Sequence, residues 1–175
     1  ALGVFTNISY VFQAGAMMGN AVRHYLGARF SRLKVSGDRR ATLSVVAMLL
    51  VAIGLACALG ILFVQGLGDV FLLWVFGPET AQSADLLLIV SIALALRLLT
   101  AVPTSLVYAY GGTVGQFWRE LFFVVIVVAL SQLLIPEQGL IGAGLLLLIV
   151  SALRLAADTA RVLYVMARAP DRQSE

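Results

Sequence analysis

The chain has 175 residues, the size of about one domain, and 61% of them are hydrophobic while 12% are charged. Soluble proteins average about 45–50% and about 25% for these two classes, so a water-soluble globule of this composition would lack the polar surface to cover itself. The formal charge of +3 does not indicate a nucleic-acid partner, because the basic residues stand in short blocks between apolar runs. We therefore expect an all-α protein that crosses a membrane several times.

Side chains that support catalysis or bind metals are scarce. His24 is the single histidine, and Cys57 is the single cysteine and lies inside an apolar run. A disulfide within the chain and a Cys/His metal site are thereby excluded, and a Ser-His-Asp set would have to use His24. We expect no enzyme, no metal and no cofactor. The chain begins at Ala1 without the pattern of a signal peptide, and we expect it to be a piece of a longer protein.

Five segments are apolar and long enough to cross a bilayer as helices, which takes about 20 residues. They are residues 2–26, 42–64, 84–107, 117–135 and 140–162. Together they predict a single transmembrane helical domain over residues 1–175. Residues 67–76 form a further apolar piece that is too short to cross. It is either an interfacial helix or an extension of the second span, and Gly77-Pro78 closes it.

The charges of the connections predict the orientation of these spans. Apart from Arg97 and Arg154, which lie deep inside spans, the lysines and arginines fall at the first connection, the third connection and the tail, or at the span ends that adjoin them. The second and fourth connections carry carboxylates and no cation. By the positive-inside rule, the first and third connections and the C-terminus are cytoplasmic, and Ala1 lies outside.

The first span is the least apolar, and its polar side chains share one helical face. Successive members are three or four residues apart: Thr6, Tyr10, Gln13, Met17, Asn20 and His24. Such a stripe avoids lipid, so it either hydrogen-bonds to other helices or lines a water-filled cavity. Gly15 and Gly19 on a neighbouring face also permit close helix packing. As hydrogen-bonding residues of a cavity wall we select Tyr10, Gln13 and Asn20.

Arg97 lies inside the third span, about 16 Å along the helix from Leu86 and so near the middle of the bilayer. A charge at that depth costs about 2.5–3.5 kcal/mol on insertion scales, so it needs a cavity, a partner or an anionic ligand. We select Arg97 as a ligand-binding residue. The alternative is a structural ion pair with a carboxylate elsewhere in the full chain. Thr100 and Thr104 continue the same face and Pro103 frees a carbonyl one turn back, which predicts a kinked polar wall.

The fourth and fifth spans add two charged motifs. Arg119-Glu120 opens the fourth span beside Trp118, which is typical of an anchor at the membrane interface. In the fifth span Arg154 and Asp158 lie four residues apart on one face, a spacing that predicts an ion pair within the helix. Arg154 also lies deep enough in the span to be a second candidate for binding an anion.

Two turn motifs connect these features to a known family. One is FGPE at residues 76–79, and the other is IPEQGLIGA at residues 135–143. They follow a polar first helix with a basic connection that contains Gly37-Asp38, and a helix that begins with ADLLL at residues 84–88 lies between them. Over essentially its whole length the chain resembles the C-terminal lobe of polysaccharide and O-antigen flippases. These belong to the multidrug/oligosaccharidyl-lipid/polysaccharide exporter superfamily.

The resemblance implies one lobe of a two-lobed transporter of about twelve to fourteen helices. Such a flippase moves a polyprenyl-pyrophosphate-linked oligosaccharide across the bacterial inner membrane by alternating access, for the biosynthesis of lipopolysaccharide O-antigen and other surface polysaccharides. Its partners are then the lipid-linked oligosaccharide, membrane lipid and the N-terminal lobe of the same protein. In that setting depth and periodicity assign the pyrophosphate to Arg97 and Arg154, and sugar hydroxyls to Tyr10, Gln13 and Asn20.

Three other functions stay open on the sequence alone. A drug or small-cation exporter of the same superfamily would need membrane-embedded carboxylates, whereas the deep charges here are arginines. A non-transporting structural membrane subunit would use Arg97 only to pair with a partner. A membrane glycosyltransferase would need paired acidic residues that bind a metal at a membrane face, and the loop carboxylates are spread apart.

Overall fold

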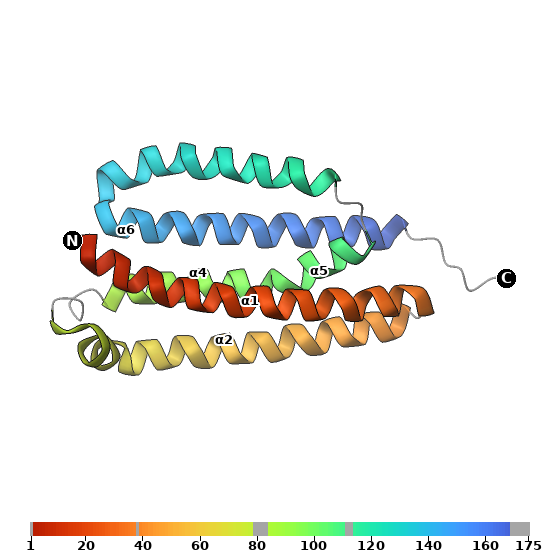
Figure 1. The fold of residues 1–175 in the computed structure, drawn as a ribbon, viewed down its shortest axis with the longest axis horizontal. Coiled ribbons are helices and arrows are strands. Elements are labelled where there is room, and N and C mark those ends of the chain that lie inside the picture. Colours follow the sequence, from red (N-terminus) through yellow and green to blue (C-terminus); the bar gives the residue numbers. More distant parts are fainter. Residues whose placement is uncertain (1, 38, 79–83, 111–113, 169–175) are drawn as a thin grey trace.

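The computed structural model describes residues 2–37, 39–78, 84–110 and 114–168. In this part of the chain the elements are helices without any strand: α1 (Leu2–Ser36), α2 (Arg39–Phe76), α4 (Ala84–Leu99), α5 (Ala101–Tyr110) and α6 (Val114–Arg168). α6 reverses direction at Gly139, so its two halves lie side by side and antiparallel, as Figure 1 shows. The predicted all-α fold is confirmed.

Three helical segments are long and apolar enough to cross a membrane: Arg40–Phe76, Asp85–Tyr110 and Phe117–Tyr164. The last of them contains the reversal at Gly139. α2 also exposes a row of large apolar side chains, with Leu55, Leu59 and Leu62 each more than half exposed. Such a surface is favourable against lipid and costly against water. The described helices therefore have the architecture of a helical membrane protein.

Glycines with a positive φ end the first two helices. Gly37 (φ 72°) follows α1 and Gly77 (φ 86°) follows α2, where the Gly77 amide donates to the Leu73 carbonyl at 3.1 Å. Glycine adopts this left-handed conformation without the clash that a side chain would cause. Because no earlier residue breaks them, both helices run beyond the predicted spans 2–26 and 42–64. The apolar piece 67–76 is an extension of α2, and its last turns leave the axis of the helix (olive in Figure 1).

The third predicted span is divided at Thr100 into α4 and α5. The division lies three residues before Pro103, which has no amide hydrogen to give to the Leu99 carbonyl. Two hydrogen bonds continue the ladder around it, from the Thr100 amide to Leu96 at 3.1 Å and from the Thr104 amide to Thr100 at 3.0 Å. Residues 101–107 that follow are all buried. The break that proline predicts thus lies in the most enclosed part of the described chain.

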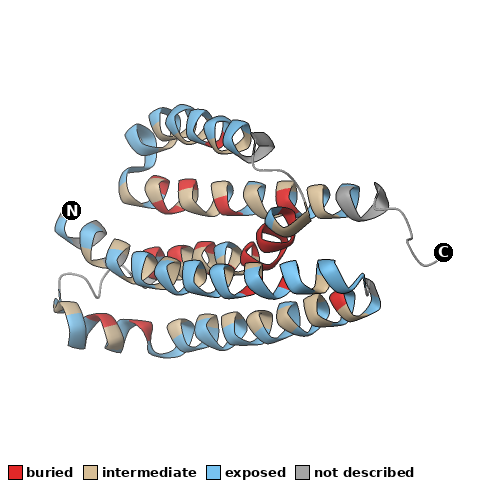
Figure 2. Ribbon diagram, turned by 45° about the vertical axis from the view of Figure 1, so that its right-hand side comes forward, coloured by how far each residue is buried: buried red, intermediate tan, exposed pale blue. Residues whose placement is uncertain are grey.

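The α4–α5 run is the centre of the bundle, and α1, α2 and α6 pack around it. Two buried apolar clusters fix this arrangement. They consist of Leu72, Leu86, Leu87 and Val90 between α2 and α4, and of Leu26, Phe30, Val102 and Leu106 between α1 and α5. Figure 2 shows buried residues gathered along α5, with others on the second half of α6 and in the last turns of α2. Gly15 and Gly19 allow α1 to approach α4, since a Cβ there would meet Leu94 and Leu98, as the sequence predicts.

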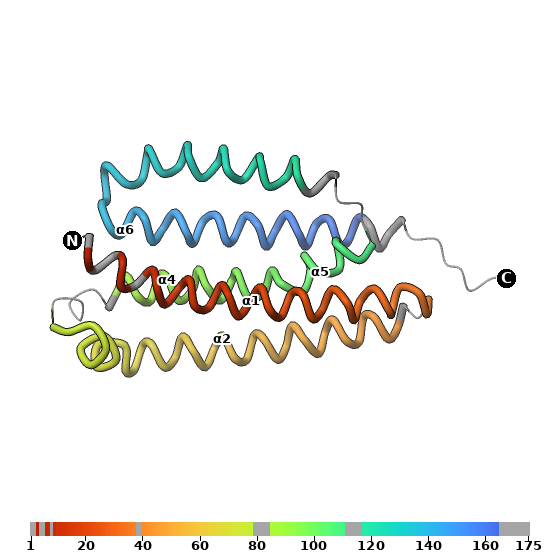
Figure 3. The backbone as a smooth tube through the Cα atoms, in the orientation of Figure 1, coloured from red at the N-terminus to blue at the C-terminus, as the bar shows by residue number. Residues whose placement is uncertain are grey.

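The helices alternate in direction, and this sorts charged residues to the two ends of the bundle. The end of α1, the start of α2, the end of α5 and both termini of α6 lie at one end (right in Figures 1 and 3). The start of α1, the end of α2, the start of α4 and the reversal of α6 lie at the other. Basic residues of the first end are Arg29, Arg32, Lys34 and Arg40, and acidic residues of the second are Asp69, Asp85 and Glu137.

The reversal of α6 supports the first testable prediction. Gly139 has φ 57° and ψ −124°, a conformation that other residues avoid. We expect Gly139→Ala to reduce the free energy of unfolding by about 1–3 kcal/mol. Gly54→Ala is the control, because Gly54 lies within α2 with nothing within 4 Å of an added Cβ, and alanine should there be neutral or stabilising. Thermal unfolding of the purified protein in detergent measures both variants, and equal stability would contradict a structural role for the Gly139 turn.

Candidate functional site

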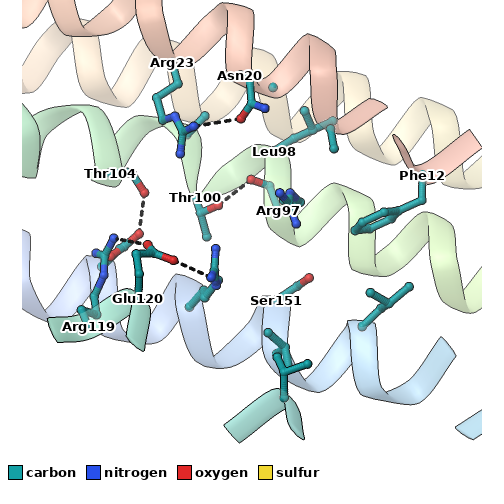
Figure 4. A pocket seen from close by; sticks show the side chains of 18 of the residues that line it. Phe12, Asn20, Arg23, Arg97, Leu98, Thr100, Thr104, Arg119, Glu120 and Ser151 are labelled. Atoms are coloured by element: carbon teal, nitrogen blue, oxygen red, sulfur yellow. Dashed lines mark hydrogen bonds and ion pairs between the residues drawn. The ribbon is translucent and has the colours of Figure 1, made fainter. Parts of the chain in front are cut away.

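A cavity of about 260 Å³ lies between α1, the α4–α5 run and both halves of α6. We call it the central cavity, and Figure 4 shows its lining. The polar residues of the lining are Asn20, Arg23, Arg97, Thr100, Thr104, Arg119, Glu120, Ser151, Arg154 and Asp158. Four of them are arginines and two are carboxylates, so the lining has a formal net charge of +2. A cavity with this balance attracts an anion.

The α6 hairpin brings the charged residues of its two halves together. Arg119 lies 20 residues before Gly139, and Asp158 lies 19 residues after it. Because the halves are antiparallel, positions at nearly equal distances from the turn lie opposite each other. Arg119 and Glu120 of the first half therefore face Arg154 and Asp158 of the second half.

The ion pairs of the central cavity connect the two halves of α6. Arg119 pairs with Asp158, and Glu120 bridges two arginines, with Arg119 Nη2 at 3.0 Å from its Oε1 and Arg154 Nη2 at 2.6 Å from its Oε2. The predicted pairing of Arg154 with Asp158 within one helix is wrong. Arg119-Glu120 contributes ion pairs to the wall of the cavity, which the sequence did not predict, while its role as an interface anchor stays a prediction. The pairing prediction considered one helix at a time, whereas the closest opposite charges of Arg154 and Asp158 lie across the hairpin.

Asp158 is the most enclosed charge of this group. Its side chain is 5% exposed, and besides Arg119 it accepts a hydrogen bond of 2.5 Å from the Thr104 hydroxyl of α5. Two donors nearby are unsatisfied, since Nε of Arg119 and Nε of Arg154 are buried without a hydrogen-bond partner among the described residues. Buried donors without an acceptor are costly, so these two nitrogens favour an additional acceptor at the cavity.

Two cations of the cavity, Arg23 and Arg97, have no carboxylate partner in the described part of the chain, and of these Arg97 also makes no side-chain hydrogen bond there. Its guanidinium carbon lies 5.5 Å from the centroid of the Phe12 ring, a cation–π contact. Thr100 donates to the backbone carbonyl of Arg97 at 2.5 Å, which stabilises the chain at the break between α4 and α5. Arg154 has a similar aromatic neighbour, Phe123 at 5.1 Å, but its guanidinium also pairs with Glu120. Arg97 is therefore the arginine most available to a ligand.

The structure brings together three of the five residues selected from the sequence. Arg97, Arg154 and Asn20 line the central cavity, and Asn20 accepts a hydrogen bond of 2.9 Å from Arg23. Tyr10 is 61% exposed and Gln13 is exposed, and neither belongs to the lining of this cavity. Ligand binding by these five residues stays a prediction.

Sequence reasoning missed several members of the central cavity. Arg23 counted only as an orientation signal, although it lies three residues after Asn20 on the polar face of the first span. Arg119 and Glu120 lie at the start of a helix, and no periodicity indicates that this start meets the far half of the hairpin. The signal that was present is the turn at residues 135–143, because a tight reversal there fixes which positions face each other.

No family model, curated protein or solved structure matches the chain. The functional conclusion therefore depends on the chemistry of the central cavity and on the architecture around it.

The second prediction tests the buried pair between Arg119 and Asp158. We expect Asp158→Ala to lower the free energy of unfolding by about 3–5 kcal/mol, because the Arg119 charge then stays buried without its partner. Thermal unfolding in detergent, followed by circular dichroism, measures the loss. Asp69→Ala removes an exposed carboxylate near the end of α2 and should change the free energy by no more than about 0.5 kcal/mol.

A double variant separates the charge effect from lost packing. Replacing Arg119 and Asp158 together by leucine removes both charges, so it should recover most of the loss caused by Asp158→Ala alone. A double variant that is no more stable than Asp158→Ala would show that the pairing of charges is not the cause.

Proposed function

We propose that the chain is part of a membrane flippase that moves a polyprenyl-pyrophosphate-linked oligosaccharide across the bacterial inner membrane. Alternating access of two lobes would expose the central cavity to each side in turn, for the biosynthesis of O-antigen and other surface polysaccharides. The observation that carries the proposal is the central cavity, whose four arginines exceed its carboxylates by two charges within helices of membrane-spanning length and hydropathy.

The charge of the lining supports an anionic ligand over a cationic one. Arginines within a membrane are costly unless a counter-charge or water solvates them. Glu120 and Asp158 balance two of the four arginines, and Arg97 has no carboxylate partner in the described chain. Guanidinium groups bind phosphate oxygens through parallel N–H bonds, which suits a pyrophosphate. A drug or small-cation exporter would place the opposite charge here.

The volume of the cavity supports a ligand of which only the head is enclosed. At about 260 Å³ the cavity is smaller than the range of about 300–1,000 Å³ that is usual for whole small-molecule sites. It has room for a phosphate-sized group and is too small to enclose a complete oligosaccharide. A lipid-linked glycan matches this limit, because its pyrophosphate is compact while its sugars lie in water and its polyprenyl chain lies in lipid.

The arrangement of helix ends supports the orientation that the charges predict. α1 is 35 residues long but less apolar than the three segments of membrane-spanning hydropathy. We nevertheless count five membrane spans: α1, α2, the α4–α5 run and the two halves of α6. In this arrangement α1 starts outside and the C-terminus lies in the cytoplasm. The resemblance of the two turn motifs adds the N-terminal lobe of the same protein as the missing half of the transporter.

A structural membrane subunit is the second candidate function. The ion pairs of the α6 hairpin favour it, because Arg119 and Arg154 both have carboxylate partners and can stabilise the fold without binding a ligand. Arg97 distinguishes the two candidates, since in the described chain it has an aromatic neighbour and no carboxylate.

The third prediction concerns Arg97. In cells that depend on the full protein, Arg97→Ala should reduce the export of surface polysaccharide about tenfold or more, because the pyrophosphate loses a charge-assisted hydrogen-bond donor. Arg97→Lys should retain part of the export, since lysine keeps the charge without the fork of donors. Arg29→Ala is the control, because Arg29 is exposed and lies outside the central cavity.

Membrane abundance measured in parallel separates the two candidate functions. Normal export by Arg97→Ala would refute the flippase site. Loss of this variant from the membrane would favour the structural subunit, with Arg97 as a partner in assembly. Lost export at unchanged abundance supports the flippase.

The fourth prediction tests the orientation by single cysteines in a Cys57→Ala background. Val35 is 89% exposed at the end of α1, and Glu137 is exposed two residues before the reversal of α6. An impermeant thiol reagent added to spheroplasts should label Glu137→Cys and leave Val35→Cys unlabelled, and both should react after permeabilisation. The reverse pattern would place the basic end of the bundle outside.

A further inference from the structure

A second cavity, of about 430 Å³, lies between α1 and α5. We call it the outer cavity. Its polar lining consists of Arg23, His24, Ser31, Ser105 and Tyr108. It lies farther along α1 than the central cavity, toward the basic end of the bundle, and Arg23 belongs to both linings. Its volume is within the range of about 300–1,000 Å³ that is usual for sites that hold a small ligand.

The charges around the outer cavity are of one sign. Among the described residues the lining contains the cation Arg23 and no carboxylate. The Lys34 ammonium lies at its rim, where it donates to the carbonyl of Ala109, a lining residue, at 3.0 Å. The same ammonium lies 5.6 Å from the centroid of the Tyr110 ring, which fixes it against α5. The local field therefore favours an anion.

The wall of the outer cavity also presents unused hydrogen-bonding groups. Ser31 donates to the Gly27 carbonyl at 2.9 Å and Ser105 donates to the Ala101 carbonyl at 2.6 Å, so both hydroxyl protons are engaged within their own helices. The side chains of His24 and Tyr108, in contrast, make no hydrogen bond within the described chain, and both are exposed. Their N–H and O–H groups are available to a ligand that accepts hydrogen bonds.

We propose that the outer cavity is a second anion-binding site, which takes a phosphate group between His24, Tyr108 and the cations Arg23 and Lys34. The phosphate belongs either to a soluble phosphate compound or to the head of a phospholipid at the membrane surface. The site does not depend on the proposed transport, because apart from Arg23 its residues lie outside the central cavity.

The test is a calorimetric titration of the purified full chain in nanodiscs of phosphatidylcholine, with inorganic pyrophosphate as the probe. The unmodified protein should bind pyrophosphate at two sites. Ala28→Glu places a carboxylate in the outer cavity, whose lining includes Ala28, and should abolish one of them. Arg29→Gln is the matched control. It makes the net charge more negative by one unit, as Ala28→Glu does, but at a neighbouring residue that does not line the cavity.

A second pair of variants keeps the net charge of the lining and removes only the donors. His24→Ala and Tyr108→Phe should each weaken the outer site by about tenfold, as expected for the loss of one hydrogen bond to a charged group. These variants decide the outcome if Ala28→Glu fails to fold. Unchanged binding in both of them would overturn the site.

The outcomes separate this site from the proposed function. A single pyrophosphate site that Arg97→Ala abolishes would overturn the outer site and leave the flippase proposal intact. A site that Ala28→Glu abolishes and Arg97→Ala does not affect would support the outer site and contradict the role of Arg97. Equal weakening by Ala28→Glu and Arg29→Gln would show that only the general charge of this end attracts pyrophosphate, which also overturns the site.

A second arm identifies the source of the phosphate. Nanodiscs that contain phosphatidic acid offer a phosphate monoester at the membrane surface. If this lipid displaces pyrophosphate from the outer site, the site takes a phospholipid head. If pyrophosphate binding is unchanged, the site takes a soluble phosphate compound.

Discussion

The ion pair between Arg119 and Asp158 is the interaction on which the central cavity depends. It joins the two halves of α6 far from their turn, and the hydrogen bond from Thr104 to Asp158 attaches the hairpin to α5. Each partner is almost enclosed, with side chains 13% and 5% exposed. Because either charge alone would be costly in this environment, the two halves stay together and keep Glu120 and Arg154 at the cavity wall. The turn at Gly139 determines which residues of the two halves of α6 lie opposite each other, and the ion pair stabilises that alignment.

The sequence predicts the architecture better than it predicts the partners of the charges. Apolar length indicates the helices, Gly77-Pro78 and the turn motif at residues 135–143 indicate two of their ends, and Pro103 indicates the break near Thr100. These features are local, so they can be recognised in one segment. The pairing of Arg119 with Asp158 depends on the register of two segments 39 residues apart, which no single helix encodes. The same reason explains why Arg97 was recognised by its depth, whereas Arg119 was interpreted as an interface anchor.

The excess of arginine over carboxylate in the central cavity has a physical consequence for the fold itself. Two of the arginines have carboxylate partners, and Arg23 has the amide oxygen of Asn20 at 2.9 Å. Arg97 has only the face of Phe12, and a cation–π contact contributes about 0.5–2 kcal/mol, less than the cost of leaving a charge unpaired away from water. The fold thus retains two positive charges that its own carboxylates do not neutralise, and for Arg97, which lacks even an amide partner, water or an anion in the cavity is needed to solvate the charge.

The two cavities meet at the contact between α1 and α5, and the packing there determines what can move. The Ser105 hydroxyl donates to the Ala101 carbonyl at 2.6 Å, and the Arg23 carbonyl of α1 lies 3.2 Å from the same hydroxyl oxygen, so the two backbones lie close together. The apolar cluster between α1 and α5 lies on the same contact, and full burial of each such side chain is worth about 1.5–3 kcal/mol. Separating the helices would expose several of these side chains at once. Moving the Arg23 guanidinium breaks one hydrogen bond to Asn20. The side chain of Arg23 is therefore the part of this boundary that moves at the lowest cost.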